Sequence, residues 1–215
     1  MATVLEKVKT TKRTPAQEMT YEEFLDWADE DTYAEWVDGK VEIMSPASES
    51  HQDISDFLTA ILRVYMEDHD AGRVLSAPFQ MKLTPSIRSG REPDQMFVAK
   101  NNLGRIKRNY IDGPADLVIE IVSPESVLRD RGAKYAEYEA GGVREYWIID
   151  NLSQRADFFV LDGEGRYQRA TPDAGGKYTS AVLPGFWISV GWLWQTPLPP
   201  VRSVLREWEA AGQEK

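Results

Sequence analysis

The stretch ADLVIEIVSP at residues 115–124 decides the fold. Its length, its β-branched residues and its closing Ser-Pro predict a single β-strand. From Leu117 to Val122 the residues do not alternate between apolar and polar, so we expect both faces of this strand to be covered, as in the interior of an α/β sheet. Glu120 would then lie among buried neighbours.

Glu120 needs a specific reason to lie in such a strand. Burying an ionised carboxylate without a partner costs several kcal/mol of folding free energy. Three arrangements avoid that cost: Glu120 is protonated, it is paired with a base, or it holds a cation. Because side chains alternate along a strand, Asp116, Val118 and Val122 are expected on the same face as Glu120.

The residues before this strand predict a helix followed by an extended segment. Ser48 is an expected N-cap, and the apolar residues after it keep helical spacing to about residue 68, with Gly72 ending the helix. Residues 73–83 alternate as one expected strand, and residues 86–92 are expected to form a loop.

The residues after it predict a second helix and a second strand. A helix is expected over residues 125–140, with Gly141 and Gly142 as its left-handed C-terminal cap. The next apolar run, VREYWIID at 143–150, is expected to pair in parallel with the first strand, because a helix separates the two. The order predicts a right-handed crossover in a mixed α/β sheet.

Other elements flank this core. Thr20 and Glu23 form an expected capping box, and Asp38-Gly39 predicts a hairpin turn. An antiparallel β-meander is expected at 155–161, 167–170 and 178–182. The expected organisation is a loose N-terminal arm at 1–18, a single domain at 19–198 and a C-terminal amphipathic helix at 199–215.

Residues 184–200 contain three tryptophans in a short apolar segment. Such a cluster is explained either by packing within the chain or by contact with a partner subunit. The amphipathic helix that follows favours the second interpretation, so we expect a homodimer or a higher homo-oligomer.

Composition limits the possible functions. The chain has 215 residues, no cysteine, two histidines and a formal net charge of −10. Any metal would therefore be held mainly by oxygen, and bulk attraction to nucleic acid is not expected. No run approaches the roughly 18 apolar residues that span a bilayer, and no signal peptide is evident, so we expect a cytoplasmic protein without membrane contact.

A local basic segment could nevertheless contact nucleic acid. Lys100, Arg105, Lys107 and Arg108 lie between Ala99 and Tyr110 with no acid among them. They form either a nucleic-acid-binding loop or an ordinary solvated one.

Asp94 and Glu120 are the strongest candidates for chemistry. Asp94 follows Pro93 and begins a short apolar strand at 96–98, and if that strand lies beside the strand of Glu120 the two carboxylates converge. Two carboxylates, the main-chain carbonyl of Ile121 and waters are a typical ligand set for Mg²⁺. The alternatives are a turn-type hydrogen bond for Asp94 and a structural ion pair to Arg129 or Arg131 for Glu120.

Pro93-Asp94 followed by Glu120-Ile121-Val122 resembles the motif of the PD-(D/E)XK nuclease superfamily, whose core is a helix, three strands, a helix and a fourth strand. More narrowly, five blocks within residues 20–195 resemble the bacterial family of restriction-endonuclease-like proteins often called Uma-type. The blocks are AEWVDGKVEIMSPASESH, EPDQMFV, ADLVIEIVSPES, DRGAKYAEYEAGGVREYWIID and PGFWISV.

The resemblance implies an α/β (α+β) fold with a restriction-endonuclease-like core, in which a mixed sheet is flanked by helices. It also implies that Asp94 and Glu120 bind Mg²⁺ or Mn²⁺ and that DNA is the substrate. The lysine of the parent motif is absent, because that position holds Val122, and Lys134 on the next helix is the matching residue. Alternatively, Lys134 is a surface partner of Asp130.

Two further residues lie in matching blocks. His51 is expected either to contribute to the site from the first helix or to make a local hydrogen bond at the start of that helix. Glu35 is the weaker candidate.

These observations leave three hypotheses. The first is a Mg²⁺-dependent phosphodiesterase acting on DNA, with Asp94 and Glu120 as ligands and Lys134 as their electrostatic partner. The second is a homo-oligomeric binding protein that keeps the nuclease fold without catalysis, which Val122, the acidic charge and the tryptophans favour. The third, glycoside hydrolysis by a pair of carboxylates, does not explain Lys134 or the order of the elements.

Overall fold

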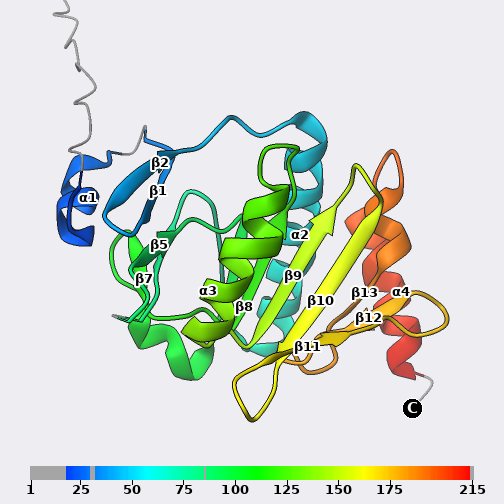
Figure 1. Cartoon of the computed structure of the whole chain (residues 1–215). Coiled ribbons are helices and arrows are strands. Elements are labelled where there is room, and N and C mark those ends of the chain that lie inside the picture. Colours follow the sequence, from blue (N-terminus) through cyan, green and yellow to red (C-terminus); the bar gives the residue numbers. More distant parts are fainter. Residues whose placement is uncertain (1–17, 30–31, 85, 214–215) are drawn as a thin grey trace, which may run out of the picture.

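The structure is a computed structural model that describes residues 18–29, 32–84 and 86–213. The expected N-terminal arm lies outside these residues except for Glu18. The described residues form a six-stranded sheet of order β11-β10-β9-β8-β6-β3, a five-stranded sheet of order β2-β1-β5-β4-β7 and a two-stranded sheet of β12 and β13 (Figure 1).

The strands of the large sheet are β3 (Gly72–Ser76), β6 (Gln95–Ala99), β8 (Leu117–Ile121), β9 (Glu145–Asp150), β10 (Arg155–Leu161) and β11 (Tyr167–Ala170). Those of the smaller sheets are β1 (Ala34–Val37), β2 (Lys40–Ile43), β4 (Gln80–Lys82), β5 (Ser89–Arg91), β7 (Tyr110–Asp112), β12 (Lys177–Thr179) and β13 (Trp187–Ser189). The helices are α1 (Tyr21–Trp27), α2 (Glu49–His69), α3 (Lys134–Gly141) and α4 (Val201–Gln213), with a π-helical turn η2 (Arg129–Ala133) before α3 and 3₁₀ turns η1 (Lys100–Arg105) and η3 (Val190–Trp194).

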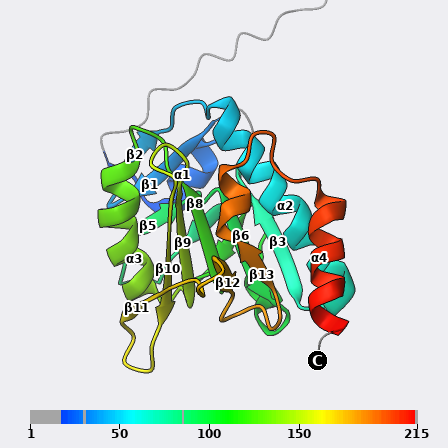
Figure 2. The same cartoon turned by 90° about the vertical axis from the view of Figure 1, so that its right-hand side faces the viewer.

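The predicted strand around Glu120 is β8, and it lies inside the large sheet. It pairs in parallel with β9 and antiparallel with β6, and all five of its residues are buried. Figure 2 shows α3 on one face of the sheet and α2 with α4 on the other. The expectations of a strand covered on both faces and of a parallel crossover are confirmed.

Alternation along β8 divides the core into two layers. Leu117, Ile119 and Ile121 belong to the apolar cluster that includes α2 and α4. Val118 and Val122 belong to the cluster that includes α3, which is the face of Glu120. Glu120 therefore points toward α3.

The local signals at the N-terminal end are confirmed. Thr20 and Glu23 form the reciprocal capping box of α1. Asp38 and Gly39, at φ 48° and 88°, form the turn between β1 and β2. Both positions require the left-handed conformation, which Asp and Gly adopt more readily than other residues. The hairpin extends the small sheet through the pairing of β1 with β5.

The end of α2 was predicted wrongly. Ser48 is its N-cap as expected, but its C-cap is Asp70, which takes the left-handed conformation and whose N–H bonds to the carbonyl of Met66. Gly72 is the first residue of β3 instead. A short polar side chain tolerates the left-handed conformation, so the glycine was not needed as the terminator.

Residues 73–83 are two strands and not one. β3 pairs with β6 in the large sheet, whereas β4 pairs with β5 and β7 in the small one. Pro78 lies between them and has no N–H to continue a ladder. The expected loop at 86–92 likewise contains a strand, β5. The sequence pattern of such a short segment does not reveal that it pairs with strands of another sheet.

The C-terminal region differs from the predicted meander in its last strand. β10 and β11 are antiparallel neighbours as expected, and β10 also pairs antiparallel with β9, but β12 leaves the large sheet and pairs with β13. Trp187, Trp192 and Trp194 pack against the apolar cluster within the chain, and α4 contacts α2. Trp192 is buried within the chain, Trp187 and Trp194 are only partly buried, and oligomerisation stays a prediction.

Within the described ranges, no helix combines the length and the apolar composition needed to cross a membrane.

Candidate active site

A cavity of about 230 Å³ opens at the carboxyl end of β8, and both Asp94 and Glu120 line it. The strand register explains this convergence. β6 and β8 are antiparallel with Gln95 opposite Ile119, so Asp94, immediately before β6, comes beside Glu120. His51 from the first turn of α2 and Lys134 from the start of α3 line the same cavity.

Asp94 is bound to the neighbouring strand and not to its own turn. Its Oδ2 accepts a hydrogen bond from the backbone N–H of Ile121 at 2.7 Å and lies 3.2 Å from His51 Nε2. Burial opposes protonation of His51, but the hydrogen bond and charge of Asp94 outweigh it and raise the pKa of the imidazole. The His51 backbone N–H also donates to Ser48 Oγ, which is the local N-cap bond of α2, and the role of the side chain in the site stays a prediction.

Glu120 is paired with a base. Its Oε1 accepts hydrogen bonds from Lys134 Nζ at 2.8 Å and from the Tyr138 hydroxyl at 2.7 Å, and neither Arg129 nor Arg131 bonds to it. Burial, followed by the charges of nearby carboxylates such as Asp130 and Asp94, raises the pKa of Glu120 to about 8, although Lys134 opposes the shift. The raised pKa reflects several carboxylates crowded in a buried site around the single ammonium of Lys134.

Lys134 is buried and not a surface partner of Asp130. Its Nζ lies 2.8 Å from Glu120 Oε1, 3.0 Å from Glu35 Oε1 and 3.8 Å from Asp130 Oδ1. Burial opposes its charge, but Glu120 and Glu35 outweigh that effect and raise the pKa of the lysine, so it remains an ammonium. One helix residue therefore connects carboxylates from β1, β8 and η2.

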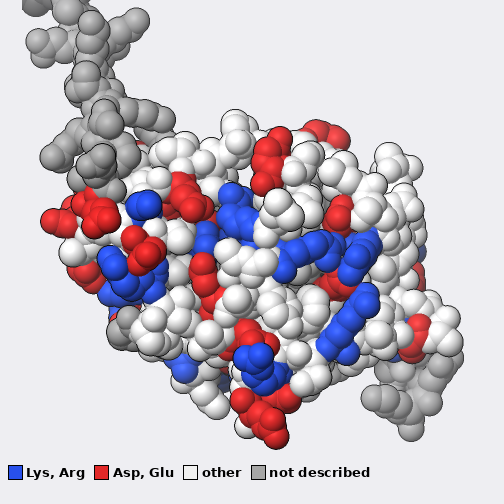
Figure 3. Space-filling view, in the orientation of Figure 1, with Lys and Arg blue, Asp and Glu red and all other residues white. Residues whose placement is uncertain are grey.

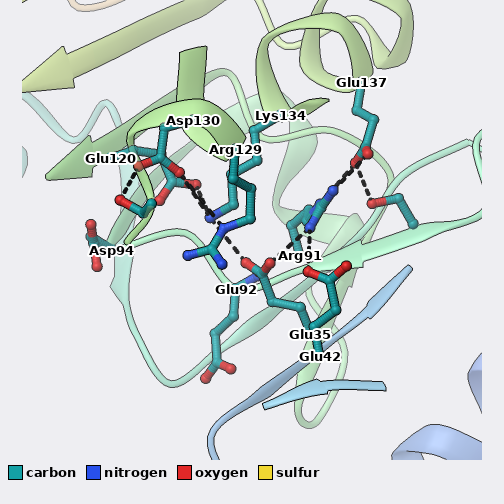
Figure 4. Close-up of polar contacts among 12 residues, drawn as sticks. Glu35, Glu42, Arg91, Glu92, Asp94, Glu120, Arg129, Asp130, Lys134 and Glu137 are labelled. Atoms are coloured by element: carbon teal, nitrogen blue, oxygen red, sulfur yellow. Dashed lines mark hydrogen bonds and ion pairs between the residues drawn. The ribbon is translucent and has the colours of Figure 1, made fainter. Parts of the chain in front are cut away.

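The site continues into a buried chain of charges that the sequence did not suggest. Arg91 at the end of β5 lies 2.8 Å from Glu35 Oε2 and 2.6 Å from Glu137 Oε1 on α3. Figure 4 shows Lys134 between Glu120 and Glu35, and Arg91 between Glu35 and Glu137. A buried arginine requires carboxylate partners, but those of Arg91 are 56 and 46 residues away in sequence, and only the fold brings them together.

Glu92 is a further carboxylate of the cavity wall that the sequence did not single out. Burial, followed by the charge of Glu35, raises the pKa of Glu92 to about 8. Its position beside Asp94 in the block EPDQMFV was the available signal. The wall carries five acids, Glu92, Asp94, Glu120, Glu125 and Asp130, and three bases, His51, Arg129 and Lys134.

The donor set fits a divalent cation held partly by water. Among described residues, no group of three or more His, Asp or Glu side chains is gathered as a metal site. Mg²⁺ is commonly held by one or two carboxylates with waters, so Asp94, Glu120 and the Ile121 carbonyl meet that lower requirement. Each carboxylate also keeps an oxygen, Asp94 Oδ1 and Glu120 Oε2, to which no described residue donates a hydrogen bond. The crowded carboxylates and their free oxygens favour a cation here, because a bound cation would stabilise the ionised form of both acids.

The basic segment is not part of this site. Lys100 follows the end of β6, whereas Asp94 precedes its start, so the two lie at opposite ends of one strand. Its cations have partners of their own: Lys100 pairs with Asp70, Arg105 donates to the carbonyl of Pro114, and Lys107 donates to that of Gly104. The structure brings Asp94, Glu120, Lys134, His51 and Glu35 together and leaves Lys100, Arg105, Lys107 and Arg108 apart.

The comparisons with known proteins identify the family and the fold. The family model described as "Uma2: Putative restriction endonuclease" matches residues 21–191. The chain belongs to this family. The Uma2 match spans both sheets, the cavity and every residue of the buried charge chain, so the expected Uma-type family is confirmed.

Two individual proteins are similar to this Uma2 chain. A Synechocystis protein described as "Uncharacterized protein slr1290" is 23% identical over 153 residues, which cover 70% of this chain and 78% of the relative. A crystal structure from Anabaena variabilis, described as a putative nuclease belonging to DUF820, has a TM-score of 0.67 and 18% identity, and the match covers 82% of this chain and 97% of that one. The second likeness confirms the mixed α/β fold.

Proposed function

We propose that this protein is a metal-dependent endonuclease that hydrolyses phosphodiester bonds of DNA, with Mg²⁺ or Mn²⁺ as its cofactor. One observation carries the proposal: Asp94 and Glu120, from adjacent antiparallel strands, line one cavity together with the buried ammonium of Lys134. Two acids and a lysine in this arrangement suit a reaction in which negative charge increases at phosphorus.

Asp94, Glu120 and the Ile121 carbonyl would hold the cation. When bound, it would neutralise phosphate charge and make a water molecule a better nucleophile at neutral pH. The protein contributes orientation: the Ile121 N–H fixes one oxygen of Asp94, and Lys134 with Tyr138 fixes one oxygen of Glu120. Both carboxylates therefore keep a second oxygen for a ligand in the cavity.

Lys134 supports this function although it lies outside the parent motif. The position two residues after Glu120 holds Val122, but the ammonium of Lys134 reaches Glu120 from the next helix at 2.8 Å. The same charge is thus supplied to the same carboxylate by a different element. Glu35 and Arg91 position the lysine, because Glu35 bonds to both bases.

The test is nicking of supercoiled DNA in Mg²⁺ or Mn²⁺. Asp94→Asn and Glu120→Gln keep the side-chain shape and are each expected to reduce the nicking rate by more than about 100-fold, since replacing even an outer-shell partner of a metal costs about 10–100-fold. Asp116→Asn is the matched control. Asp116 is a buried acid just before β8 that accepts from the Ala99 N–H outside the cavity.

The control is expected to keep its nicking rate provided that its circular dichroism spectrum is native. Full activity of either Asp94→Asn or Glu120→Gln would exclude this assignment of the two ligands.

A second candidate is a nuclease-fold binding protein without catalysis. It is favoured by the bonds that Lys134 and Tyr138 already make to Glu120, which satisfy that carboxylate without a metal. Calorimetric titration separates the two, because this candidate predicts no heat of binding for Mg²⁺ or Mn²⁺.

A further inference from the structure

Asp157 on β10 is the centre of an arginine cluster. Its side chain is fully buried, and three arginines converge on it: Arg131 from η2, Arg155 from β10 at 2.8 Å and Arg169 from β11 at 2.6 Å. Arg131 also lies 3.6 Å from Asp150. Three guanidinium groups thus share two carboxylates, and the cluster carries a net positive charge.

The cluster has hydrogen-bonding capacity to spare. Each guanidinium has five N–H donors, whereas Asp157 accepts hydrogen bonds from three guanidinium nitrogen atoms and lies 2.8 Å from a fourth, Arg155 Nε. The side chains of Arg155 and Arg169 are 56% and 57% exposed, so their remaining donors face solvent. Asp157 holds these arginines in place without neutralising them.

The cluster leads to the candidate active site. Arg131 is two residues after Arg129 on η2, and Arg129 lines the cavity. Figure 3 shows lysine and arginine side chains in a band across the face that carries α3. We call Arg129, Arg131, Arg155 and Arg169 the arginine stripe. A local positive band on a chain of net charge −10 is an exception that calls for a polyanionic partner.

We propose that the arginine stripe binds the phosphate backbone of DNA beside the bond that is cut. The inference rests on the proposed function, and it replaces the basic segment at Lys100–Arg108 as the DNA contact. Guanidinium groups bind phosphate oxygens in pairs of parallel hydrogen bonds, and the contact carries no base specificity. The stripe therefore fixes the position of the substrate and not its sequence.

The first experiment measures binding of a short fluorescein-labelled DNA duplex by anisotropy, in EDTA to prevent turnover and over a series of salt concentrations. The double variant Arg155→Gln/Arg169→Gln is expected to weaken binding by about tenfold or more and to reduce the slope of log K against log salt by about 2, one unit for each lost phosphate contact. Arg155→Lys/Arg169→Lys keeps the charge and is expected to retain the slope.

The matched control is Lys107→Gln/Arg108→Gln, which removes the same charge from the segment between η1 and β7 and is expected to leave binding unchanged. Equal losses in both double variants, or a loss in the control alone, would overturn the inference. So would tighter binding of an RNA duplex of the same sequence, because the proposal commits to DNA.

Hydrolysis of bis(4-nitrophenyl) phosphate separates this inference from the proposed function. That small diester can occupy the cavity without extending to Arg155 and Arg169, so the Arg155→Gln/Arg169→Gln variant is expected to hydrolyse it at the normal rate. If the diester is not hydrolysed by any variant but DNA binding still depends on Arg155 and Arg169, the function fails and the inference stands. If hydrolysis depends on Asp94 but DNA binding does not depend on Arg155 and Arg169, the proposed function stands and the inference is overturned.

Discussion

Glu35 is fully buried and yet remains charged. Burial opposes its ionisation, but the ion pairs with Lys134 and Arg91 outweigh that effect and lower the pKa of the carboxyl to about 2. A carboxylate with a lowered pKa in the folded state stabilises the protein above its unfolded pKa, and this contribution is lost as the pH falls toward about 2. The difference from the ordinary value of 4.5 corresponds to about 3 kcal/mol.

Glu35→Gln is expected to lower the free energy of unfolding at neutral pH by about 3–5 kcal/mol, because it leaves buried cations without their partner. The variant should also lose part of the acid dependence of stability that wild type shows as the pH falls from about 4.5 to about 2. Urea denaturation at a series of pH values measures both effects.

Glu42→Gln is the control, since Glu42 lies 3.6 Å from Arg91 but is 45% exposed. Its loss is expected to cost less than about 1 kcal/mol. Equal effects of the two substitutions would contradict the special role of Glu35.

Val122 occupies the position of the lysine in the parent motif, so a substitution there tests whether Lys134 on α3 replaces that lysine. Its side chain shares the face of Glu120 and is buried against α3. Lys134→Met is expected to abolish nicking. The double variant Lys134→Met/Val122→Lys should nick DNA at least about tenfold faster than Lys134→Met, because it returns an ammonium to Glu120 from the same strand. Plasmid nicking by the single and double variants measures this rescue. A double variant as slow as Lys134→Met would show that the ammonium is needed at its position on α3.

Elements with local signals could be predicted from the sequence. The capping box of Thr20, the turn at Asp38-Gly39, the N-cap Ser48 and the left-handed cap at Gly142 all depend on neighbouring residues only. The strand β8 could be predicted because its composition reports burial on both faces. The division of residues 73–83 between two sheets could not, since strand partners are set by tertiary packing.

The candidate site divides in the same way. Asp94 and Glu120 stood out because an acid beside an apolar run is unusual, and Lys134 stood out because it matches the displaced lysine of the family that the sequence resembles. Arg91 and Glu137 did not, because an arginine in a polar segment and a glutamate on a helix look like surface residues until the fold buries them together. The arginine stripe was missed for a related reason, since its members come from three separate elements.

Glu145 at the start of β9 connects residues 178–182, in and after β12, to the large sheet through hydrogen bonds. It is buried, and no lysine or arginine lies within ion-pair distance of it in the described ranges. Its carboxylate accepts five hydrogen bonds, from Trp147 Nε1, the Tyr178 hydroxyl, Ser180 Oγ and the backbone N–H groups of Ala181 and Val182. Charge-assisted bonds of this kind are worth more than neutral ones.

Glu145→Ala is expected to lower the free energy of unfolding by more than about 3 kcal/mol, because it leaves several buried donors unpaired. Hydrogen exchange should become faster in β12 and β13 before it changes at the cavity, which lies at the other end of β9. Glu164→Gln, in an exposed turn, is the control and should change neither quantity. Uniformly faster exchange along the chain would argue against a local fastening role.

Binding of a cation should stabilise the folded chain as a unit. At a free Mn²⁺ concentration about 100 times the dissociation constant, the gain is about 2.7 kcal/mol, which corresponds to a rise in Tm of about 5–10 °C for a chain of this size. Calorimetry of wild type and Asp116→Asn should show this rise, whereas Asp94→Asn and Glu120→Gln should show little of it. A rise of equal size in all four proteins would place the cation elsewhere.

Glu35 belongs to the small sheet, yet Lys134, one of the two bases that it holds, also pairs with Glu120 of the large sheet. The hairpin of β1 and β2 is therefore part of the site, and a truncated chain without it is not expected to be active. A fragment that starts at α2 would retain every strand of the large sheet but would leave Lys134 and Arg91 without their shared anchor. Grafting the cavity onto another scaffold would require transplanting the hairpin with it.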